Sequence, residues 1–262
     1  MKIGIFDSGL GGLYLLKAIS KKLPKYDYVF LGDTKNLPYG SKSQRQIYNL
    51  TTKAVEFLFD QGCGLVIIAC NTASAQALRK IQLNFLPQYA SGHKVLGVIR
   101  PTVEVIKAGD TCVLATAATA RAKAYTRELR NLNPKLQITE LAAPDLVWLL
   151  ETSQLAKLDQ AVAKYSELIN NRKAKNLILG CTHYAVFKDK FAKHLRPGIR
   201  LISQDEIVPQ KLHDYLLRHE EIETRISRNR RRKFFVTKLD RQFLHSAKQW
   251  FGQKINLELA KY

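Results

Sequence analysis

The chain has 262 residues, of which 46% are hydrophobic and 24% charged, and this balance argues against an intrinsically disordered protein. No apolar run approaches the roughly 18 residues that a membrane helix needs, and the N-terminus lacks an apolar signal core, so we expect a cytoplasmic protein without a membrane partner. The 42 Lys and Arg residues outnumber the 22 Asp and Glu residues and give a net charge of +20. Nucleic acid or an acidic surface is therefore a candidate partner, beside the plainer explanations of a basic proteome or solubility.

Short apolar runs alternate along the chain with stretches whose apolar residues recur at helical spacing. Amphipathic helices are expected, among others, at residues 13–23, 46–62 and 158–173. Strands that alternate with helices predict an α/β fold built on parallel sheets. The expected strands are residues 2–6, 28–33, 65–71, 94–99, 111–116, 136–142, 176–182 and 200–203.

A repeated feature predicts two domains. An apolar run that ends in a cysteine occurs once in each half of the chain, which indicates two related α/β units facing each other across a cleft. We expect the first domain at residues 1–98 plus 208–262 and the second at residues 99–207. The hinge is expected near residues 97–103, where Pro101 biases Arg100 away from helical backbone. A second crossing is expected near residues 202–208, after which the patterns at 213–217 and 234–237 return to the first domain.

The first motif, FDSGLGG at residues 6–12, places Asp7 and Ser8 at the end of the first expected strand. The glycines that follow allow a tight turn and the close approach of a ligand. A simpler interpretation is a glycine-rich turn capped by Asp7 or Ser8, since both residues are good N-caps. The motif is not G-x-G-x-x-G and no ribose-binding acid lies about 20 residues further on, so we reject dinucleotide binding.

Two later loops are rich in small hydrogen-bonding groups. Residues 38–41 follow the second expected strand, and their amides and hydroxyls could meet a carboxylate or form an ordinary proline turn. Thr116 and Thr119 follow another strand and could bind an anion or cap the next helix.

The four cysteines form no C-x-x-C pair and have no histidine at zinc-like spacing, so we expect free thiols and no metal. Cys63 and Cys112 lie among apolar residues at strand entrances, where we expect plain core packing. Cys70 and Cys181 end their apolar runs and are followed at once by polar residues, where a helix N-terminus can favour a thiolate. Two thiols that face one cleft predict proton transfer on both faces of a substrate.

The residues next to these two cysteines are small hydrogen-bonding groups, namely Asn71, Thr72, Thr182 and His183. This set suits an amino acid, with its carboxylates and ammonium, better than a phosphate ester. Inversion of an α-carbon requires proton removal from one face and proton supply to the other, which two groups on opposed walls can perform. Thiols suit this task because a free cysteine has a pKa of about 8.5, so one can be thiolate and the other thiol near neutral pH.

Five motifs in this order and spacing resemble the aspartate/glutamate racemase family, and its glutamate racemases in particular: FDSGLGG, GDTKNLPYG, ACNTASA, ATAAT and GCTHY. The resemblance runs from Lys2 to about Val208 and more loosely through residues 234–237. It implies cofactor-independent inversion of L-glutamate to D-glutamate for peptidoglycan, without metal, pyridoxal phosphate or nucleotide. It also implies two pseudo-symmetric α/β domains with the active site between them, and a homodimer.

The resemblance assigns roles to individual residues. Cys70 and Cys181 would be the two acid/base groups, one for each enantiomer. Asp7 would assist Cys70, and His183 would assist Cys181. The expected substrate-binding residues are Asp7, Ser8, Pro38, Tyr39, Gly40, Ser41, Asn71, Thr72, Thr116, Thr119, Thr182 and His183.

The chain departs from the family pattern at three positions. Arg100 stands where the family usually has Glu, and Ala185 and Trp148 replace usual prolines. Trp148 lies in the segment that leads to Glu151, an acid expected near His183. These three differences could alter the rate, the regulation or the substrate of the enzyme. They leave the central residues of the family unchanged.

Two other functions stay open at the level of the sequence. One is racemisation of another acidic amino acid such as aspartate. The other is a basic nucleic-acid-binding or gyrase-binding regulatory protein on the racemase scaffold, since some family members are reported to act on DNA gyrase. The basic run at residues 228–233 is either a solvated loop or a phosphate-binding patch, formed by Arg228, Arg230, Arg231, Arg232 and Lys233.

Overall fold

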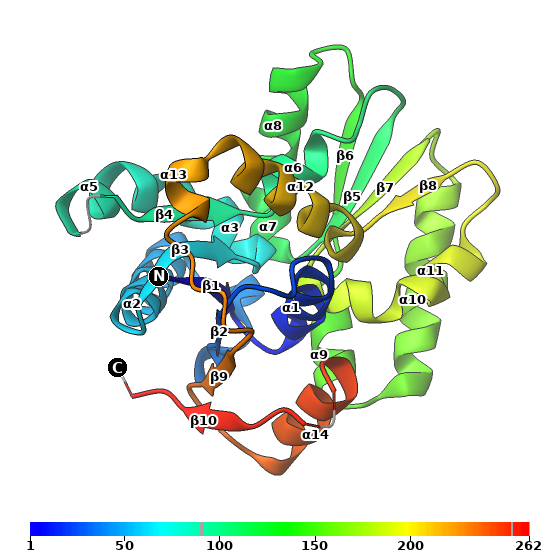
Figure 1. Cartoon of the computed structure of the whole chain (residues 1–262). Helices are drawn as coiled ribbons and strands as arrows, with labels where there is room; N and C mark the ends of the chain where they lie inside the picture. Colours follow the sequence, from blue (N-terminus) through cyan, green and yellow to red (C-terminus); the bar gives the residue numbers. More distant parts are fainter. Residues whose placement is uncertain (90–91, 253, 262) are drawn as a thin grey trace.

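The computed structural model describes residues 1–89, 92–252 and 254–261, and within them the strands form two parallel sheets (Figure 1). The larger sheet has the order β10-β9-β2-β1-β3-β4 and the smaller one the order β6-β5-β7-β8. We call them the six-stranded and the four-stranded sheet. The prediction of an α/β fold with two parallel sheets is confirmed. No helix in these ranges is long and apolar enough to span a bilayer.

All eight predicted strands are present. The strands of the six-stranded sheet are β1 (Lys2–Asp7), β2 (Tyr28–Gly32), β3 (Cys63–Ile68), β4 (Lys94–Gly97), β9 (Arg232–Val236) and β10 (Leu257–Leu259). Those of the four-stranded sheet are β5 (Thr111–Ala115), β6 (Ile138–Ala142), β7 (Asn176–Gly180) and β8 (Arg200–Ile202). Two further strands were not among these eight. Strand β9 contains most of the pattern at residues 234–237, and β10 is short and mostly exposed at the sheet edge, so it carries no buried apolar run that could mark it.

Helices connect these strands and cover both sheets. They are α1 (Gly11–Lys22), α2 (Gln44–Asp60), α3 (Asn71–Gln76), α4 (Leu78–Lys80), α5 (Leu86–Tyr89), α6 (Ile99–Val103), α7 (Ala117–Ala122), α8 (Ala124–Leu132), α9 (Asp145–Glu151), α10 (Leu155–Asn170), α11 (Lys188–His194), α12 (Gln204–Arg218), α13 (Glu220–Glu223) and α14 (Arg241–Trp250). Short 3-10 or π segments are η1 (Thr34–Asn36), η2 (Tyr39–Ser41), η3 (Ile81–Phe85) and η4 (Thr182–Phe187). The three helices predicted by range correspond to α1, α2 and α10.

The central strands of both sheets are buried on both faces, which explains why they read as continuous apolar runs. Helices α1, α12 and α14 pack on one face of the six-stranded sheet, and α2 and α3 pack on the other. Successive residues of one strand pack on opposite faces of the sheet, as Ile5 and Phe6 do in β1. Cys63 and Cys112 are buried in these cores, so the prediction of core packing is confirmed.

The backbone at Arg100 differs from the prediction. Arg100 is the second residue of α6, followed directly by Pro101, so the proline does not exclude Arg100 from a helix. The physical reason is position, because the first turn of a helix has no internal partner for its backbone N–H groups and therefore accepts proline. Residues 98–110 nevertheless connect β4 of the six-stranded sheet to β5 of the four-stranded sheet, so the chain passes between the sheets at the segment predicted as the hinge. The domain boundaries at residues 98/99 and 207/208 stay a prediction.

Candidate active site

Side chains from the carboxyl ends of both sheets line a cavity of about 350 Å³. Parallel strands deliver their following residues to one edge, so the loops after β1, β3, β5 and β7 can meet there. Of the residues predicted for the site, all but Asp7 and Thr119 line this cavity, and those two bond to lining residues. The lining residues are Ser8, Leu37, Pro38, Tyr39, Gly40, Ser41, Cys70, Asn71, Thr72, Thr116, Ala117, Arg121, Pro144, Val147, Cys181, Thr182 and His183.

Cys70 reaches the cavity from the six-stranded sheet. It follows β3 and is the N-cap residue of α3, and its Sγ accepts a weak hydrogen bond from the backbone N–H of Ala73 at 3.5 Å. The Oγ of Ser8 lies 3.2 Å from the same sulfur. Burial raises the pKa of Cys70 to about 12, and the nearby Asp7 carboxyl adds to the shift. Without a ligand, Cys70 is therefore a protonated thiol at neutral pH.

Cys181 reaches the same cavity from the four-stranded sheet. It follows β7, and its Sγ lies 3.9 Å from Nδ1 of His183. The other ring nitrogen of His183, Nε2, lies 2.6 Å from Oε1 of Glu151, which is where the sequence placed this acid. Burial alone would lower the pKa of His183, but the hydrogen bonds to Cys181 and Glu151 outweigh it and raise this pKa well above its ordinary value. A cationic imidazole therefore stands beside Cys181.

Asp7 links the two sheets beneath the cavity. Its Oδ1 accepts a hydrogen bond from Oγ1 of Thr182 at 3.1 Å, and its Oδ2 accepts one from the N–H of Gly9 at 3.1 Å. Complete burial raises the pKa of Asp7, although the charge of His183 opposes the shift. Neither Asp7 nor Ser8 caps α1, whose N-cap residue is Leu10 without a side-chain bond. Asp7 nevertheless caps the glycine-rich turn itself through the N–H of Gly9, as the simpler interpretation expects.

The glycines of the first motif allow this close packing. A Cβ at Gly12 would lie 2.6 Å from Cβ of Asp7. A Cβ at Gly11 would lie 2.7 Å from Oγ1 of Thr182, in the loop of the other sheet. Residues with side chains at these two positions would force α1 away from the site, so glycine serves packing here rather than a special backbone angle.

Three threonine hydroxyls form a cluster across the cavity wall. Oγ1 of Thr72 lies 2.9 Å from that of Thr116 and 3.2 Å from that of Thr119, and the last two are 3.0 Å apart. Thr116 also caps α7 by accepting from the N–H of Thr119 at 3.3 Å. The capping interpretation of Thr116 is therefore confirmed, and the same residue lines the cavity, while anion binding stays a prediction.

The loop at residues 38–41 is fixed by an acid that the sequence analysis missed. The hydroxyl of Tyr39 donates to Oδ2 of Asp33 at 2.6 Å, and Thr237 after β9 donates to Oδ1 of the same carboxylate at 2.7 Å. Asp33 is fully buried and follows β2 directly. The GD pair at the end of β2 was a signal in the sequence for this acid. Thr237, which donates to Asp33, lies 204 residues away along the chain, so the contact itself had no signal.

Other lining residues were also missed. Arg121 is the clearest case, because among the described residues around the cavity it and His183 are the basic ones. Arg121 lies in α7, two residues beyond Thr119, within a run of alanines that gives no pattern. Behind the cavity, Tyr125 and Gln204 hydrogen-bond to Asn71, and no sequence motif connects these positions.

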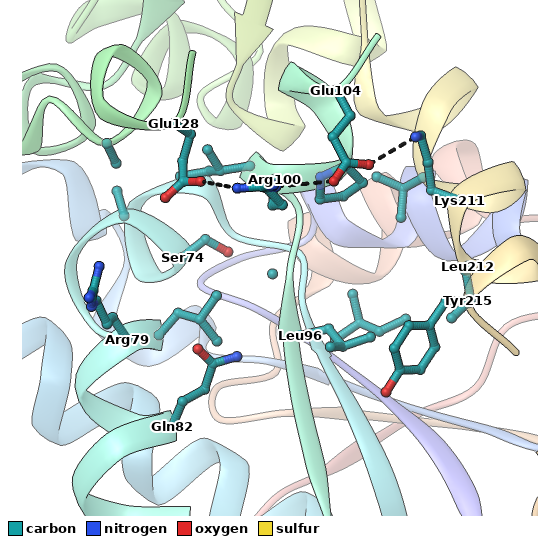
Figure 2. A pocket seen from close by; sticks show the side chains of 18 of the residues that line it. Ser74, Arg79, Gln82, Leu96, Arg100, Glu104, Glu128, Lys211, Leu212 and Tyr215 are labelled. Carbon is teal, nitrogen blue, oxygen red and sulfur yellow. Dashed lines mark hydrogen bonds and ion pairs between the residues drawn. The ribbon is translucent and has the colours of Figure 1, made fainter. Parts of the chain in front are cut away.

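A larger cavity of about 500 Å³ lies at the junction of the two sheets and contains no thiol (Figure 2). Arg100 lies here, with its guanidinium 3.1 Å from Glu104 and 3.1 Å from Glu128, and Glu104 in turn pairs with Lys211 at 2.9 Å. Figure 2 shows this chain of charges along one side of the cavity. We assign the chemistry to the smaller cavity because it holds two thiols, a cationic histidine and a set of hydroxyl donors. Within the part of the chain that is described, no group of His, Cys, Asp and Glu could hold a metal ion.

Comparison with known proteins assigns the chain to a family. A family model described as Asp/Glu/Hydantoin racemase matches residues 12–208. The glutamate racemase of Dinoroseobacter shibae is 37% identical over 238 residues, which cover 85% of this chain and 86% of that protein. The glutamate racemase of Cereibacter sphaeroides is 33% identical over 276 residues, which cover 99% and 100%.

Solved structures agree with this result. A glutamate racemase isoform from Bacillus anthracis superposes with a TM-score of 0.88 at 30% identity, covering 99% of this chain and 97% of that one. The glutamate racemase from Francisella tularensis in complex with D-glutamate also gives a TM-score of 0.88, at 29% identity and the same coverage. The predicted resemblance is confirmed, and the chain belongs to the Asp/Glu/Hydantoin racemase family, in which these relatives are glutamate racemases.

Proposed function

We propose that this enzyme inverts the α-carbon of glutamate by proton transfer between Cys70 and Cys181. The observation that carries the proposal is that two thiols, one from each sheet, line a single cavity. The substrate follows from the relatives, which are glutamate racemases, one of them solved with D-glutamate. The cavity offers hydroxyl and amide donors for two carboxylates, which supports an acidic amino acid.

The proposed step needs one thiolate and one thiol. The thiolate removes the α-proton from one face of glutamate and leaves an electron pair on the α-carbon, while the opposing thiol gives its proton to the other face. After inversion the first sulfur is protonated and the second is a thiolate, so the reverse reaction uses the same groups in exchanged roles. His183 supplies a positive charge next to Cys181 for the state in which that sulfur is anionic. Asp7 would assist Cys70. The negative charge of Asp7 raises the pKa of this thiol and so favours its protonated form.

Enclosure of the substrate supports the chemistry. The cavity is bounded by residues from both sheets, and Cys70 and Cys181 are only 4% and 6% exposed. A site with little water strengthens the electrostatic stabilisation of the carbanion-like transition state by fixed donors. D-glutamate made in this way would serve peptidoglycan synthesis. A homodimer and contacts with nucleic acid or gyrase stay predictions, and Arg228 of the basic run is already paired with Glu223 at 2.7 Å.

The experiment measures inversion of L- and D-glutamate by circular dichroism, with L-aspartate alongside. Cys70→Ser and Cys181→Ser should each lower the rate of glutamate inversion by about 10²-fold to 10⁴-fold, the usual contribution of an acid/base group. Cys112→Ala is the matched control, since this buried thiol lies outside the cavity, and it should keep activity. Inversion that survives either serine variant contradicts the assignment of that thiol, and faster inversion of aspartate contradicts the substrate.

A further inference from the structure

A buried cluster of three polar side chains adjoins the cysteine cavity. The hydroxyl of Tyr125, in α8, donates to Oδ1 of Asn71 at 2.5 Å. Nε2 of Gln204, the first residue of α12, donates to the same Oδ1 at 3.1 Å and to the Tyr125 hydroxyl at 2.8 Å. Asn71 is 2% exposed, Tyr125 is 0% exposed and Gln204 is 1% exposed. All three side chains are therefore buried and hydrogen-bonded to one another.

These bonds leave one end of the Asn71 amide unused. Its Oδ1 accepts two hydrogen bonds, whereas its Nδ2 is buried and finds no partner among the residues that the structure describes. Buried amide donors are rarely left without an acceptor, since the loss of hydration is not compensated. Asn71 follows Cys70 directly and lines the cavity with it. The missing acceptor is therefore expected in the ligand.

We propose that Tyr125 and Gln204 are positioning residues, which lock the Asn71 amide so that its NH₂ donates to a carboxylate of the substrate. The inference rests on the proposed function, which supplies an anionic acceptor. Without the two donors on Oδ1, the amide could rotate and present its oxygen to the carboxylate, which is repulsive. The two hydrogen bonds to Oδ1, which we call the lock, therefore direct the NH₂ group of Asn71 toward the carboxylate.

The lock also joins the two halves of the molecule. Asn71 begins α3 after β3 of the six-stranded sheet, whereas Tyr125 packs against the four-stranded sheet and Gln204 follows β8 of that sheet. The orientation of Asn71 therefore depends on contact between the halves beside Cys70. A substrate that needs the oriented amide binds best when the halves are together, which couples binding to their packing.

The test compares Tyr125→Phe and Gln204→Met with the control Tyr28→Phe. Tyr28 is also a buried tyrosine, whose hydroxyl donates to the backbone carbonyl of Leu23 at 2.7 Å, at the opposite end of the six-stranded sheet. The Kd for D-glutamate from calorimetry and the KM for inversion should rise about tenfold in the first two variants, as expected for a hydrogen bond to a charged group. The kcat should change less than about threefold, because binding rather than proton transfer is affected.

A double-mutant cycle shows whether Tyr125 acts through Asn71. In an Asn71→Ala background, Tyr125→Phe should change the Kd for D-glutamate less than about twofold, because the group it positions is gone. If Tyr125→Phe changes the Kd for D-glutamate equally with and without Asn71→Ala, the inference is overturned. It is also overturned if Tyr125→Phe and Gln204→Met have the same Kd as the control Tyr28→Phe. If Tyr125→Phe does not fold, the same cycle is measured with Gln204→Met, alone and combined with Asn71→Ala. If the unaltered enzyme neither binds nor inverts glutamate, the proposed function itself fails, which is a separate outcome.

Discussion

At the scale of residues, the charge state of the site follows from its burial. Cys70 is buried beside a carboxyl and stays protonated, whereas Cys181 lies beside a cationic His183. Two chemically identical thiols therefore have different surroundings before substrate arrives. This asymmetry is what a reaction between one thiol and one thiolate requires.

The pair of His183 and Glu151 makes stability depend on pH. The pKa of His183 is higher in the folded protein than its ordinary value of 6.5, so its stabilisation is fully present below that value and is lost as pH rises through the folded pKa. Glu151→Gln should therefore lower the free energy of unfolding by about 2 kcal/mol near pH 6.5, with a smaller loss at alkaline pH. Urea denaturation at several pH values measures this, with the exposed Glu167→Gln as control. A loss that grows with pH would contradict the assignment of a cationic His183.

Arg121 offers a second test at this scale. It is exposed at the cavity lining and makes no ion pair among the described residues. We expect Arg121→Ala to raise the KM for glutamate about threefold to tenfold, with the effect shrinking as salt is added because an exposed charge is screened. Arg130→Ala, an exposed arginine of α8 outside the lining, should leave KM unchanged. The same KM for both variants would show that Arg121 takes no part in binding.

At the scale of elements, the sequence was most informative where a pattern is local. The eight strands and the motifs at their ends were predicted, because a strand buried on both faces needs an apolar run and parallel strands end at a common edge. The contacts of Asp33 with Thr237 and of Asn71 with Tyr125 and Gln204 could not be predicted. Each joins segments that are distant in sequence. Asp33 meets Thr237 because β2 and β9 are neighbours in one sheet, whereas Asn71 meets Tyr125 and Gln204 because the two sheets pack together.

The segment from Ile99 to Val103 gives a prediction for the junction. Arg100 pairs with Glu104 and Glu128, yet its side chain is 56% exposed, so solvent screens both pairs. Arg100→Ala should lower the free energy of unfolding by less than about 1 kcal/mol. Lys190→Ala, which removes the similarly exposed pair with Asp159, should do the same in chemical denaturation. A much larger loss for Arg100→Ala would mean that the charges in Figure 2 hold the two sheets together.

At the scale of the whole molecule, both parallel sheets contribute residues to one cavity. One thiol comes from each sheet, and Asp7, Thr72 and Asn71 bond to residues delivered by the other sheet. The site is therefore a property of the assembled chain. The fold class and most of the lining of the cavity followed from the motifs, whereas Arg121 and the contacts between the halves followed only from the structure.

The net charge of +20 is also a property of the whole chain. We expect only weak, sequence-independent retention of DNA at low salt, because the charge attracts phosphates without a site that reads bases. Electrophoretic mobility shifts at rising salt should show this retention disappear by roughly 0.2 M. Sequence-selective binding that survives such salt would instead support the nucleic-acid role.

The account depends on two acid/base groups, and solvent isotope incorporation tests this directly. The unaltered enzyme is given L-glutamate in deuterium oxide, and both enantiomers are recovered at low conversion for NMR and mass analysis. Because the thiol that protonates the product has exchanged with solvent, the account predicts deuterium at the α-carbon of D-glutamate and none in the recovered L-glutamate. Deuterium in recovered L-glutamate at the same rate, or D-glutamate that retains the original proton, would indicate a single base and contradict the two-thiol mechanism.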